Sequence, residues 1–267
     1  MTTGQPSGFE SITDRPQYYI DFLDERTSIP GEQMAKRIIT ELLDLRAGLA
    51  VLDVGSGTGT DTIEVAKAVG PAGRVVGLDK SPDMVAAARD RATAASLPVE
   101  FVQGDAHTLD FPDASFDRVR TERMLIHLPD PEAAVREMVR VTKPGGIVVA
   151  SDIDAGTVFF NSMNKPLAEA LTQRLSDGLA QGWMGRRQQR YLINAGLENV
   201  RVVPNVILNS VAFLRIVCTG LLTAMIADNT TTAPAVDAFW SELEQGEREG
   251  WLCTGVTCFT VSGTKPH

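Results

Sequence analysis

The spacing of apolar residues changes along the chain at about residue 46. Before it, apolar side chains recur every three or four positions, which predicts amphipathic helices at 18–25 and 31–45. After it, short apolar runs that suit buried strands alternate with helical stretches. The predicted strands lie at 50–54, 74–78, 99–102, 116–120 and 147–151. The predicted helices between them lie at 58–69, 82–95 and 131–141.

This alternation predicts an α/β fold with a parallel sheet and right-handed crossovers. The strands lack a two-residue alternation of apolar and polar positions, as expected when helices cover both faces of a sheet. Ser81 and Pro82 are typical of a helix start. Beyond residue 154, the pattern predicts helices at 167–179 and 186–195, a strand at 200–206, two helices within 211–247 and a last strand at 256–263.

Composition and charge narrow the possible partners. Hydrophobic residues make up 43% of the 267 positions and charged residues 22%, which is an ordinary globular composition. The net charge of −9 argues against nucleic-acid partners and against docking on anionic membranes. No apolar run approaches the ~20 residues of a membrane span, and the N-terminus lacks a signal-peptide pattern. With three cysteines, too few for a disulfide framework, these features predict a soluble, cytoplasmic protein.

The strongest chemical signal is the segment VLDVGSGTG, in which Asp53 precedes a turn containing Gly55, Gly57 and Gly59. Glycines after a buried strand allow a tight turn and a close approach of a ligand to the backbone. A dinucleotide fingerprint would need a further glycine at position 60, which is occupied by Thr60. A purely structural turn between a strand and a helix is the alternative interpretation.

Two acidic residues follow the next two strands. Asp79 lies 20 residues after Gly59, where a carboxylate can accept hydrogen bonds from both hydroxyls of a ribose; a surface helix cap is the alternative. Asp105 and Ala106 follow the third strand, where a carboxylate can accept an amino group such as that of adenine. Because ligands of open α/β sheets bind at the carboxyl ends of the strands, these residues predict a nucleotide-type site.

Five segments in this order resemble the class I S-adenosylmethionine-dependent methyltransferases: VLDVGSGTG, VVGLDKS, GDAHTLDFPDASFDRV, HLPDP and MVRVTKPGG. The resemblance is to the small-molecule subgroup of ubiquinone, menaquinone and natural-product methyltransferases. It runs from about 51 to 154 and includes the closing segment FTVSGTKP. It implies a Rossmann-like, seven-stranded, mostly parallel sheet whose last strand is antiparallel. It also implies S-adenosylmethionine as cofactor and S-adenosylhomocysteine as product.

The resemblance further implies roles for single residues. The methionyl end and ribose of the cofactor would face Gly55, Ser56 and Gly57, with Asp53 supporting the amino group. The ribose would be flanked by Asp79 and Lys80, and the adenine by Asp105 and Ala106.

Three further cofactor contacts are expected with less definite roles. Thr121 follows the fourth strand, where backbone contacts to the cofactor are usual in the family. Tyr19 and Gln33 lie, with Tyr18, in N-terminal helices that relatives fold over the cofactor. They would touch its carboxylate or simply pack.

Methyl transfer needs alignment and, for an OH, NH or acidic CH acceptor, a base. His127, just past the fourth strand, has an unperturbed pKa of ~6.5 and is the predicted base, with simple packing as the alternative. Asp152 and Asp154 follow the fifth strand. One of them, with Asp152 as the choice, is predicted to orient the imidazole or to pair with a cationic acceptor nitrogen; loop solvation and capping of the next helix are the alternative. An ascending pH–rate limb between about pH 6 and 8 is then expected. The three histidines show no metal-ligand spacing, so no metal ion is expected.

The chain divides into an N-terminal helical lid at 1–45, a cofactor-binding Rossmann-like core at 46–205, a helical segment at 206–250 and a closing strand at 251–267. The segment at 206–250 is apolar, which suits a substrate cap or one face of a homodimer. The predicted function is methyl transfer to O, N or C of a small molecule in natural-product or secondary metabolism. One alternative is a cofactor-binding protein of this fold that catalyses a non-methylating reaction such as a cyclisation. The other is a nucleotide-dependent oxidoreductase, against which Thr60 argues.

Overall fold

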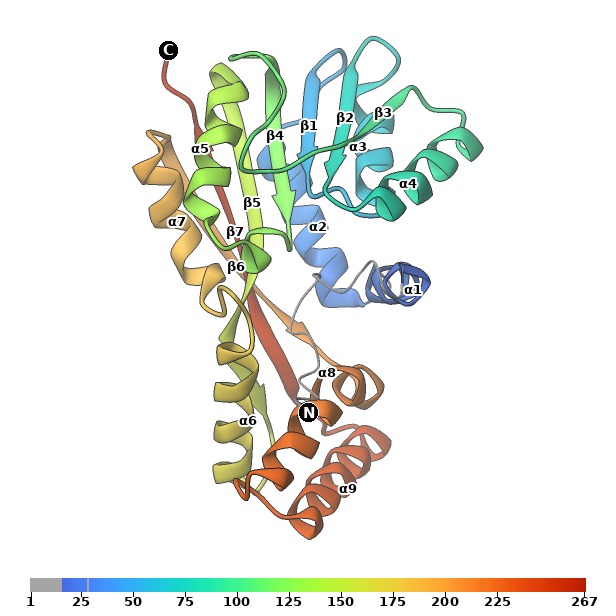
Figure 1. Cartoon of the computed structure of the whole chain (residues 1–267), viewed down its shortest axis with the longest axis vertical. Coiled ribbons are helices and arrows are strands. Elements are labelled where there is room, and N and C mark those ends of the chain that lie inside the picture. The colour runs from blue at the N-terminus through green and yellow to red at the C-terminus, as the bar shows by residue number, and fades with distance from the viewer. Residues whose placement is uncertain (1–15, 28) are drawn as a thin grey trace.

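The computed structural model describes residues 16–27 and 29–267 and centres on a seven-stranded sheet (Figure 1). The strand order is β3-β2-β1-β4-β5-β7-β6. Neighbouring strands from β3 to β5 run parallel, whereas β7 runs antiparallel to β5 and β6. The predicted, mostly parallel sheet is therefore confirmed. The strands are β1 (Ala50–Val54), β2 (Arg74–Asp79), β3 (Val99–Gln103), β4 (Phe116–Glu122), β5 (Thr142–Phe160), β6 (Glu198–Leu208) and β7 (Thr254–Thr264).

Helices cover both faces of the sheet and begin at recognisable caps. The Ser81 hydroxyl accepts a hydrogen bond from the Met84 N–H (3.4 Å), and the Asp130 carboxylate accepts one from the Ala133 N–H (3.0 Å). Each bond satisfies a backbone donor that the first helical turn leaves free. The helices are α1 (Pro16–Thr27), α2 (Pro30–Leu43), α3 (Thr60–Val69), α4 (Pro82–Ala94), α5 (Pro131–Val141), α6 (Lys165–Asp177), α7 (Met184–Asn194), α8 (Val211–Ala227) and α9 (Ala233–Glu249), with a short 3-10 turn, η2 (Leu125–His127).

The largest difference from the sequence prediction is the length of β5. The pattern places the end of this strand at Ser151, but β5 continues to Phe160. Asp152 and Asp154 are typical of loops, because aspartate is depleted in strands. Pairing with β7 overrides this preference and buries both side chains, with Asp152 opposite Phe259. The two aspartates therefore lie within the strand rather than after it.

The long strands β5, β6 and β7 carry a second lobe beyond the ends of β1 to β4 (Figure 1). We call α6, α8 and α9 the cap lobe. Its core contains Leu171, Leu222 and Phe239 and is separate from the main cluster around Leu52 and Phe116. The sequence assigned α6 to the core segment 46–205. In the structure α6 packs against both β5 and α8, and its Leu167 and Leu171 belong to the core of the cap lobe, because β5 carries the chain out to this lobe.

The two N-terminal helices lie close to the carboxyl ends of the strands. α2 packs on β5, β6 and β7, and Gly31 approaches so closely that a Cβ there would lie 2.7 Å from Cα of Ile207. α1 contacts both α2 and α4 and lies below α4 in Figure 1. A Cβ at Gly57 would lie 3.5 Å from Cδ1 of Leu23, so α1 also approaches the turn after β1. In the described part of the chain, no helix is long and apolar enough to cross a membrane.

Candidate active site

The glycine turn between β1 and α3 has the tight geometry that the sequence predicts. Gly55, Gly57 and Gly59 have φ values of 79°, 53° and 77°, a region that L side chains rarely adopt. A Cβ at Gly55 would lie 2.6 Å from Cγ of Met124, so the turn packs directly against the segment after β4. The Gly55 and Ser56 N–H groups donate to the Leu78 carbonyl (2.7 and 2.9 Å), which ties the turn to the end of β2.

Asp79 at the end of β2 holds the same turn through its side chain. Its Oδ2 accepts a hydrogen bond from the Gly57 N–H (2.8 Å), and its Oδ1 accepts one from the Ser81 N–H (2.9 Å). Burial raises the pKa of Asp79 despite these bonds. The carboxylate therefore shapes the turn, and its remaining lone-pair capacity can accept a ligand hydroxyl.

The residues predicted to flank an adenine lie after β3 and differ in exposure. Asp105 Oδ1 accepts a hydrogen bond from the His107 N–H (2.9 Å) and lies 2.6 Å from His107 Nδ1. The N–H bond is the main reason that the pKa of Asp105 is lowered. Lys80 is exposed, and its Nζ lies 3.9 Å from Asp105 Oδ2. Ala106, in contrast, is buried in the main core.

Asp53 is buried beneath the turn and has protein partners. Its Oδ2 accepts a hydrogen bond from the Thr62 hydroxyl (2.7 Å), and its Oδ1 lies 3.4 Å from Arg120 Nε. Burial raises the pKa of Asp53 more than Arg120 lowers it. Arg120 in turn donates to Glu122 Oε2 (2.7 Å), so an ion-pair chain runs from the turn to the end of β4.

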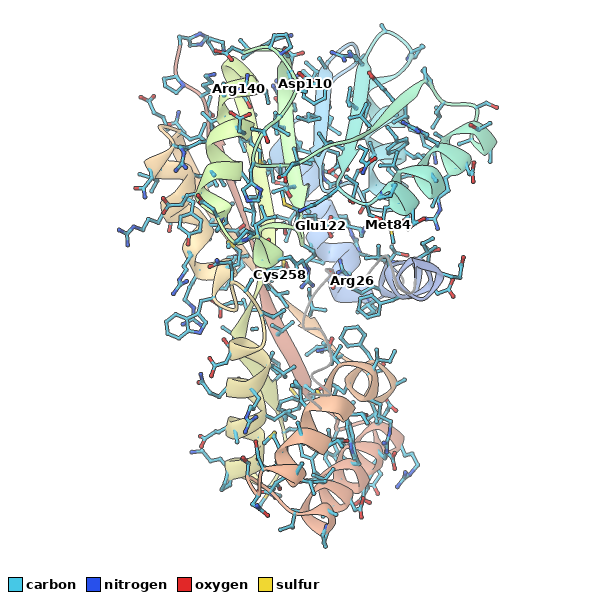
Figure 2. The ribbon with its side chains drawn as sticks, in the orientation of Figure 1. Arg26, Met84, Asp110, Glu122, Arg140 and Cys258 are labelled. Atoms are coloured by element: carbon cyan, nitrogen blue, oxygen red, sulfur yellow. The ribbon has the colours of Figure 1, made fainter. Side chains whose placement is uncertain are left out.

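Four charged side chains meet at the Glu122 end of this series of ion pairs. We call them the ion quartet: Arg26, Glu32, Glu122 and Arg123. Arg123 Nη2 donates to Glu32 Oε1 (2.5 Å), and Arg26 Nε lies 3.3 Å from the same oxygen. Arg26 Nη2 lies 3.8 Å from Glu122 Oε1. Figure 2 shows Arg26 and Glu122 between the ends of the strands and the cap lobe. Burial acts to raise the pKa of Glu32, but the positive charges of Arg123 and Arg26 outweigh it and lower the pKa.

Sequence reasoning missed the ion quartet and selected a neighbour of it. Gln33 was the residue chosen in α2, but its side chain is exposed, and the structure does not bring it into this cluster. Glu32, one position earlier, is 2% exposed and faces the site. A signal was present, since Glu32 shares the buried stripe of α2 with Ala35 and Ile39. Tyr18 and Tyr19 belong to α1, and their side chains lie outside the described part of the structure.

Buried polar atoms without a hydrogen-bond partner among the described residues gather around this site. They include Ser56 Oγ, Thr121 Oγ1, Glu32 Oε2, Glu122 Oε1, Arg123 Nε and Asp152 Oδ1. Leaving such an atom unsatisfied costs about 1–3 kcal/mol, so native proteins rarely bury several together. A polar ligand beside the glycine turn would supply their partners. The residues present therefore fit a cofactor with ribose, amino and carboxylate groups.

His127 lies in the η2 turn after β4 and Asp152 lies within β5, and their pKa values are shifted in opposite directions. Burial, together with the charges of Arg123 and Arg26, lowers the pKa of His127 to about 4. Burial raises the pKa of Asp152 to about 7, although Arg123 opposes it. Asp152 Oδ2 accepts a hydrogen bond from the Ile126 N–H (3.3 Å), so it anchors the backbone of the η2 turn that carries His127. Of these two groups, Asp152 is therefore the one whose pKa lies near neutrality.

Asp154 lies in the same strand as Asp152 but contacts a different element, α7. Its buried carboxylate forms an ion pair with Arg186 of α7, and Arg186 Nη2 donates to Asp154 Oδ1 (2.7 Å). The Gly156 N–H also donates to Oδ1 (3.1 Å). Asp154 therefore holds α7 on the sheet. In the described residues, no group of three or more His, Cys, Asp or Glu side chains is placed to hold a metal ion.

α1 contacts both the core and the cap lobe. Asp24 forms an ion pair with Arg91 of α4 (2.7 Å), and Arg91 also donates to Thr60 Oγ1 (2.7 Å) at the start of α3. The ring of Phe22 stacks on that of Phe213 in the cap lobe, with centroids 6.0 Å apart. The N-terminal helix thus bridges the cofactor side of the core and the cap lobe.

Comparisons with known proteins identify the family of the chain. A family model for a methyltransferase domain matches residues 45–194. A 37.1 kDa protein of transposon TN4556 from Streptomyces fradiae is 37% identical over 187 residues, 69% of this chain and 54% of the relative. Demethylmenaquinone methyltransferase from Staphylococcus aureus is 38% identical over 138 residues, 52% of this chain and 57% of the relative. The matches thus span a little over half the length of these curated relatives.

Solved structures share the fold at low identity. Phosphoethanolamine N-methyltransferase 2 from Haemonchus contortus, in complex with S-adenosyl-L-methionine, aligns with a TM-score of 0.61 at 19% identity, covering 97% of this chain and 60% of that one. The 4+2 cyclase SpnF aligns with a TM-score of 0.56 at 24% identity, covering 88% and 82%. Likeness at this level concerns the fold alone.

Proposed function

Because the chain belongs to the class I S-adenosylmethionine-dependent methyltransferases, we propose that it transfers a methyl group from S-adenosylmethionine to a small-molecule acceptor. The observation that carries the proposal is the glycine turn bonded to Asp79, with unsatisfied polar atoms gathered beside it. In this site Asp79 holds the ribose, and Asp105 and Ala106 flank the adenine. The bound cofactor supplies a methyl group on a sulfonium, and the protein supplies alignment and a proton acceptor.

We assign the proton acceptor to Asp152 and not to His127. A base works best when its pKa lies close to the working pH, and only Asp152 meets this condition. The ionised carboxylate takes the proton of an OH, NH or acidic CH group as that group attacks the methyl. Asp152 also fixes the η2 turn through Ile126, so neutral His127 is held in place at the same rim.

The acceptor in this proposal is largely apolar and binds between α1 and α8. Phe22 and Phe213 meet there, and α8 is rich in apolar and small residues. The similarity to demethylmenaquinone methyltransferase supports an aromatic acceptor with an ionisable hydroxyl, since a quinol has both properties.

The test uses the full chain with S-adenosylmethionine labelled on its methyl group. Reduced demethylmenaquinone, other phenolic and enolic compounds, and a metabolite extract are offered as acceptors. We expect label on one acceptor class, together with one S-adenosylhomocysteine per product. A chemically changed acceptor without label would contradict methyl transfer and favour the cyclisation alternative.

The same assay distinguishes whether Asp152 or His127 is the proton acceptor. The native rate should rise with pH around about pH 7, because Asp152 acts in its ionised form. Asp152→Asn should lower turnover roughly 10²–10⁴-fold and abolish the rise, whereas His127→Ala should retain it. A rise that persists in Asp152→Asn and disappears in His127→Ala would return the proton acceptor to His127.

A further inference from the structure

The η2 turn is held from outside by the loop between α6 and α7, residues 178–183, which we call the connector. The Gln181 N–H donates to the Ile126 carbonyl (3.0 Å), and the Gln181 side chain donates from Nε2 to the Leu128 carbonyl (3.3 Å). A 3-10 turn leaves carbonyl groups at its end without partners inside the turn. Gln181 therefore supplies donors to two carbonyls of the η2 segment.

The connector is fixed where it supports this turn. The Ala155 N–H of β5 donates to the Gly182 carbonyl (2.8 Å). A Cβ at Gly182 would lie 2.0 Å from the carbonyl oxygen of Ser176 at the end of α6, so only glycine fits there. Leu179 packs against the main core. Gln181 thus acts from a part of the chain that is itself bonded to the sheet.

The carboxylate of Asp152 depends on the turn that Gln181 supports. Its Oδ2 accepts the Ile126 N–H at 3.3 Å, whereas its Oδ1 is buried without a partner among the described residues. A hydrogen bond to the ionised form of a carboxyl group favours that form. Because this bond is long and is the one that Asp152 has in the described part of the chain, a small movement of Ile126 would change how readily Asp152 ionises.

The charged and titratable groups that act on Asp152 lie on other elements. They are Arg123 and Glu122 at the end of β4, Arg26 of α1 and Cys258 of β7. His127 is neutral near pH 7, because its pKa is about 4. None of these groups belongs to the connector, so a change at Gln181 leaves them in the site and acts through Ile126.

We propose that Gln181 is a positioning residue for the proton acceptor: it holds the η2 turn so that the Ile126 N–H stays on Asp152. Without the side-chain bond to Leu128, this short 3-10 turn is free to move away from β5. Asp152 then loses its donor, ionises at higher pH and is aligned less well with the acceptor. This inference rests on the proposed function, in which Asp152 takes the proton.

The ionisation of Asp152 is measured without any substrate. A chain labelled with ¹³C at the carboxyl carbon of aspartate is titrated by NMR, and the Asp152 signal is the one missing from Asp152→Asn. Gln181→Met keeps the length of the side chain and removes its donor. We expect its Asp152 midpoint to rise by at least about half a pH unit. The matched control is Gln189→Met, an exposed glutamine of α7, which should titrate as the native chain does.

Turnover gives the second readout, with the acceptor that takes the label in the methyl-transfer assay. Gln181→Met should lower kcat about 10-fold and leave the KM for S-adenosylmethionine within about two-fold. Native affinity for S-adenosylhomocysteine would show that the variant is folded. If Gln181 only fastens the connector, the variant will melt at a lower temperature and keep the native kcat and the native midpoint.

That result, or a midpoint that falls, would overturn the role of Gln181. An Asp152 signal that does not titrate near pH 7 in the native chain would be a different failure. It would remove Asp152 as the proton acceptor of the proposed function, and the inference with it.

Discussion

The carboxyl group of Asp152 has no exposed surface, and its surroundings set the pH at which it ionises. Burial favours the neutral form and raises its pKa from 3.8 to about 7. The folded chain therefore holds this proton more tightly than the unfolded chain does. The resulting stability is fully present below about pH 4 and is lost as the pH rises to about 7, a change of up to about 4 kcal/mol.

Asp152→Asn should reveal this cost, because the amide never becomes charged. We expect the variant without ligand to melt at a higher temperature than the native chain at about pH 8, and by a smaller margin at about pH 5. Thermal unfolding followed by circular dichroism measures both. A variant that is less stable at both pH values would mean that the ionised carboxylate stabilises the fold.

Asp79 tests the cofactor assignment at the scale of one residue. Asp79→Ala removes the acceptor for the Gly57 N–H and the proposed acceptor for the ribose hydroxyls. We expect the affinity for S-adenosylhomocysteine to fall by about 1.5–3 kcal/mol in calorimetry. Asp90→Ala, an exposed change in α4, is the control. An unchanged affinity in Asp79→Ala would show that the ribose lies elsewhere.

The sequence could identify residues whose chemistry depends on a short local segment. The glycine turn, Asp79 and Asp105 each follow a strand directly, so chain order alone places them at one edge of the sheet. Arg26, Glu32 and Arg123 come from three elements and meet only through tertiary packing. Their contacts therefore could not be derived from local spacing, and the choice of Gln33 missed the buried face of α2 by one residue.

At the scale of elements, α1 is expected to respond to the cofactor. The Asp24–Arg91 ion pair is partly exposed, and such pairs contribute only about 0–1 kcal/mol, so α1 can open to admit a ligand. Binding of S-adenosylhomocysteine should increase hydrogen-exchange protection in α1 and at the start of α2. The internal control is α7, which Asp154 holds through Arg186 and in which protection should not change. Protection that rises only in the glycine turn would contradict a lid role.

β5 shows where pattern reading fails at this scale. The sequence predicts its first half well, because Ile147, Val148 and Val149 form an apolar run. The second half is a strand only because β7 pairs with it, and the register shifts between Asp154 and Phe159. A partner strand about 100 residues later leaves no local signal, so the extension that carries the cap lobe was not predictable.

At the scale of the whole molecule, the cap lobe and the main part of the fold have separate cores. A substitution in the core of the cap lobe should therefore lower stability without changing cofactor affinity. Leu222 is 1% exposed within the cap lobe, far in the fold from the glycine turn. Leu222→Ala should lower the free energy of unfolding by about 2–5 kcal/mol in urea titration. The same variant should bind S-adenosylhomocysteine within about two-fold of the native chain. A parallel loss of cofactor affinity would mean that the cap lobe helps to form the cofactor site.

Calorimetry of the full chain with S-adenosylhomocysteine and, separately, with NADH tests the central claim most directly. The geometry of the turn, with Thr60 in place of a further glycine, predicts micromolar binding of S-adenosylhomocysteine at one site, about −8 kcal/mol, and no measurable binding of NADH. Tighter binding of NADH, or no heat with S-adenosylhomocysteine, would contradict the assignment of this site to S-adenosylmethionine.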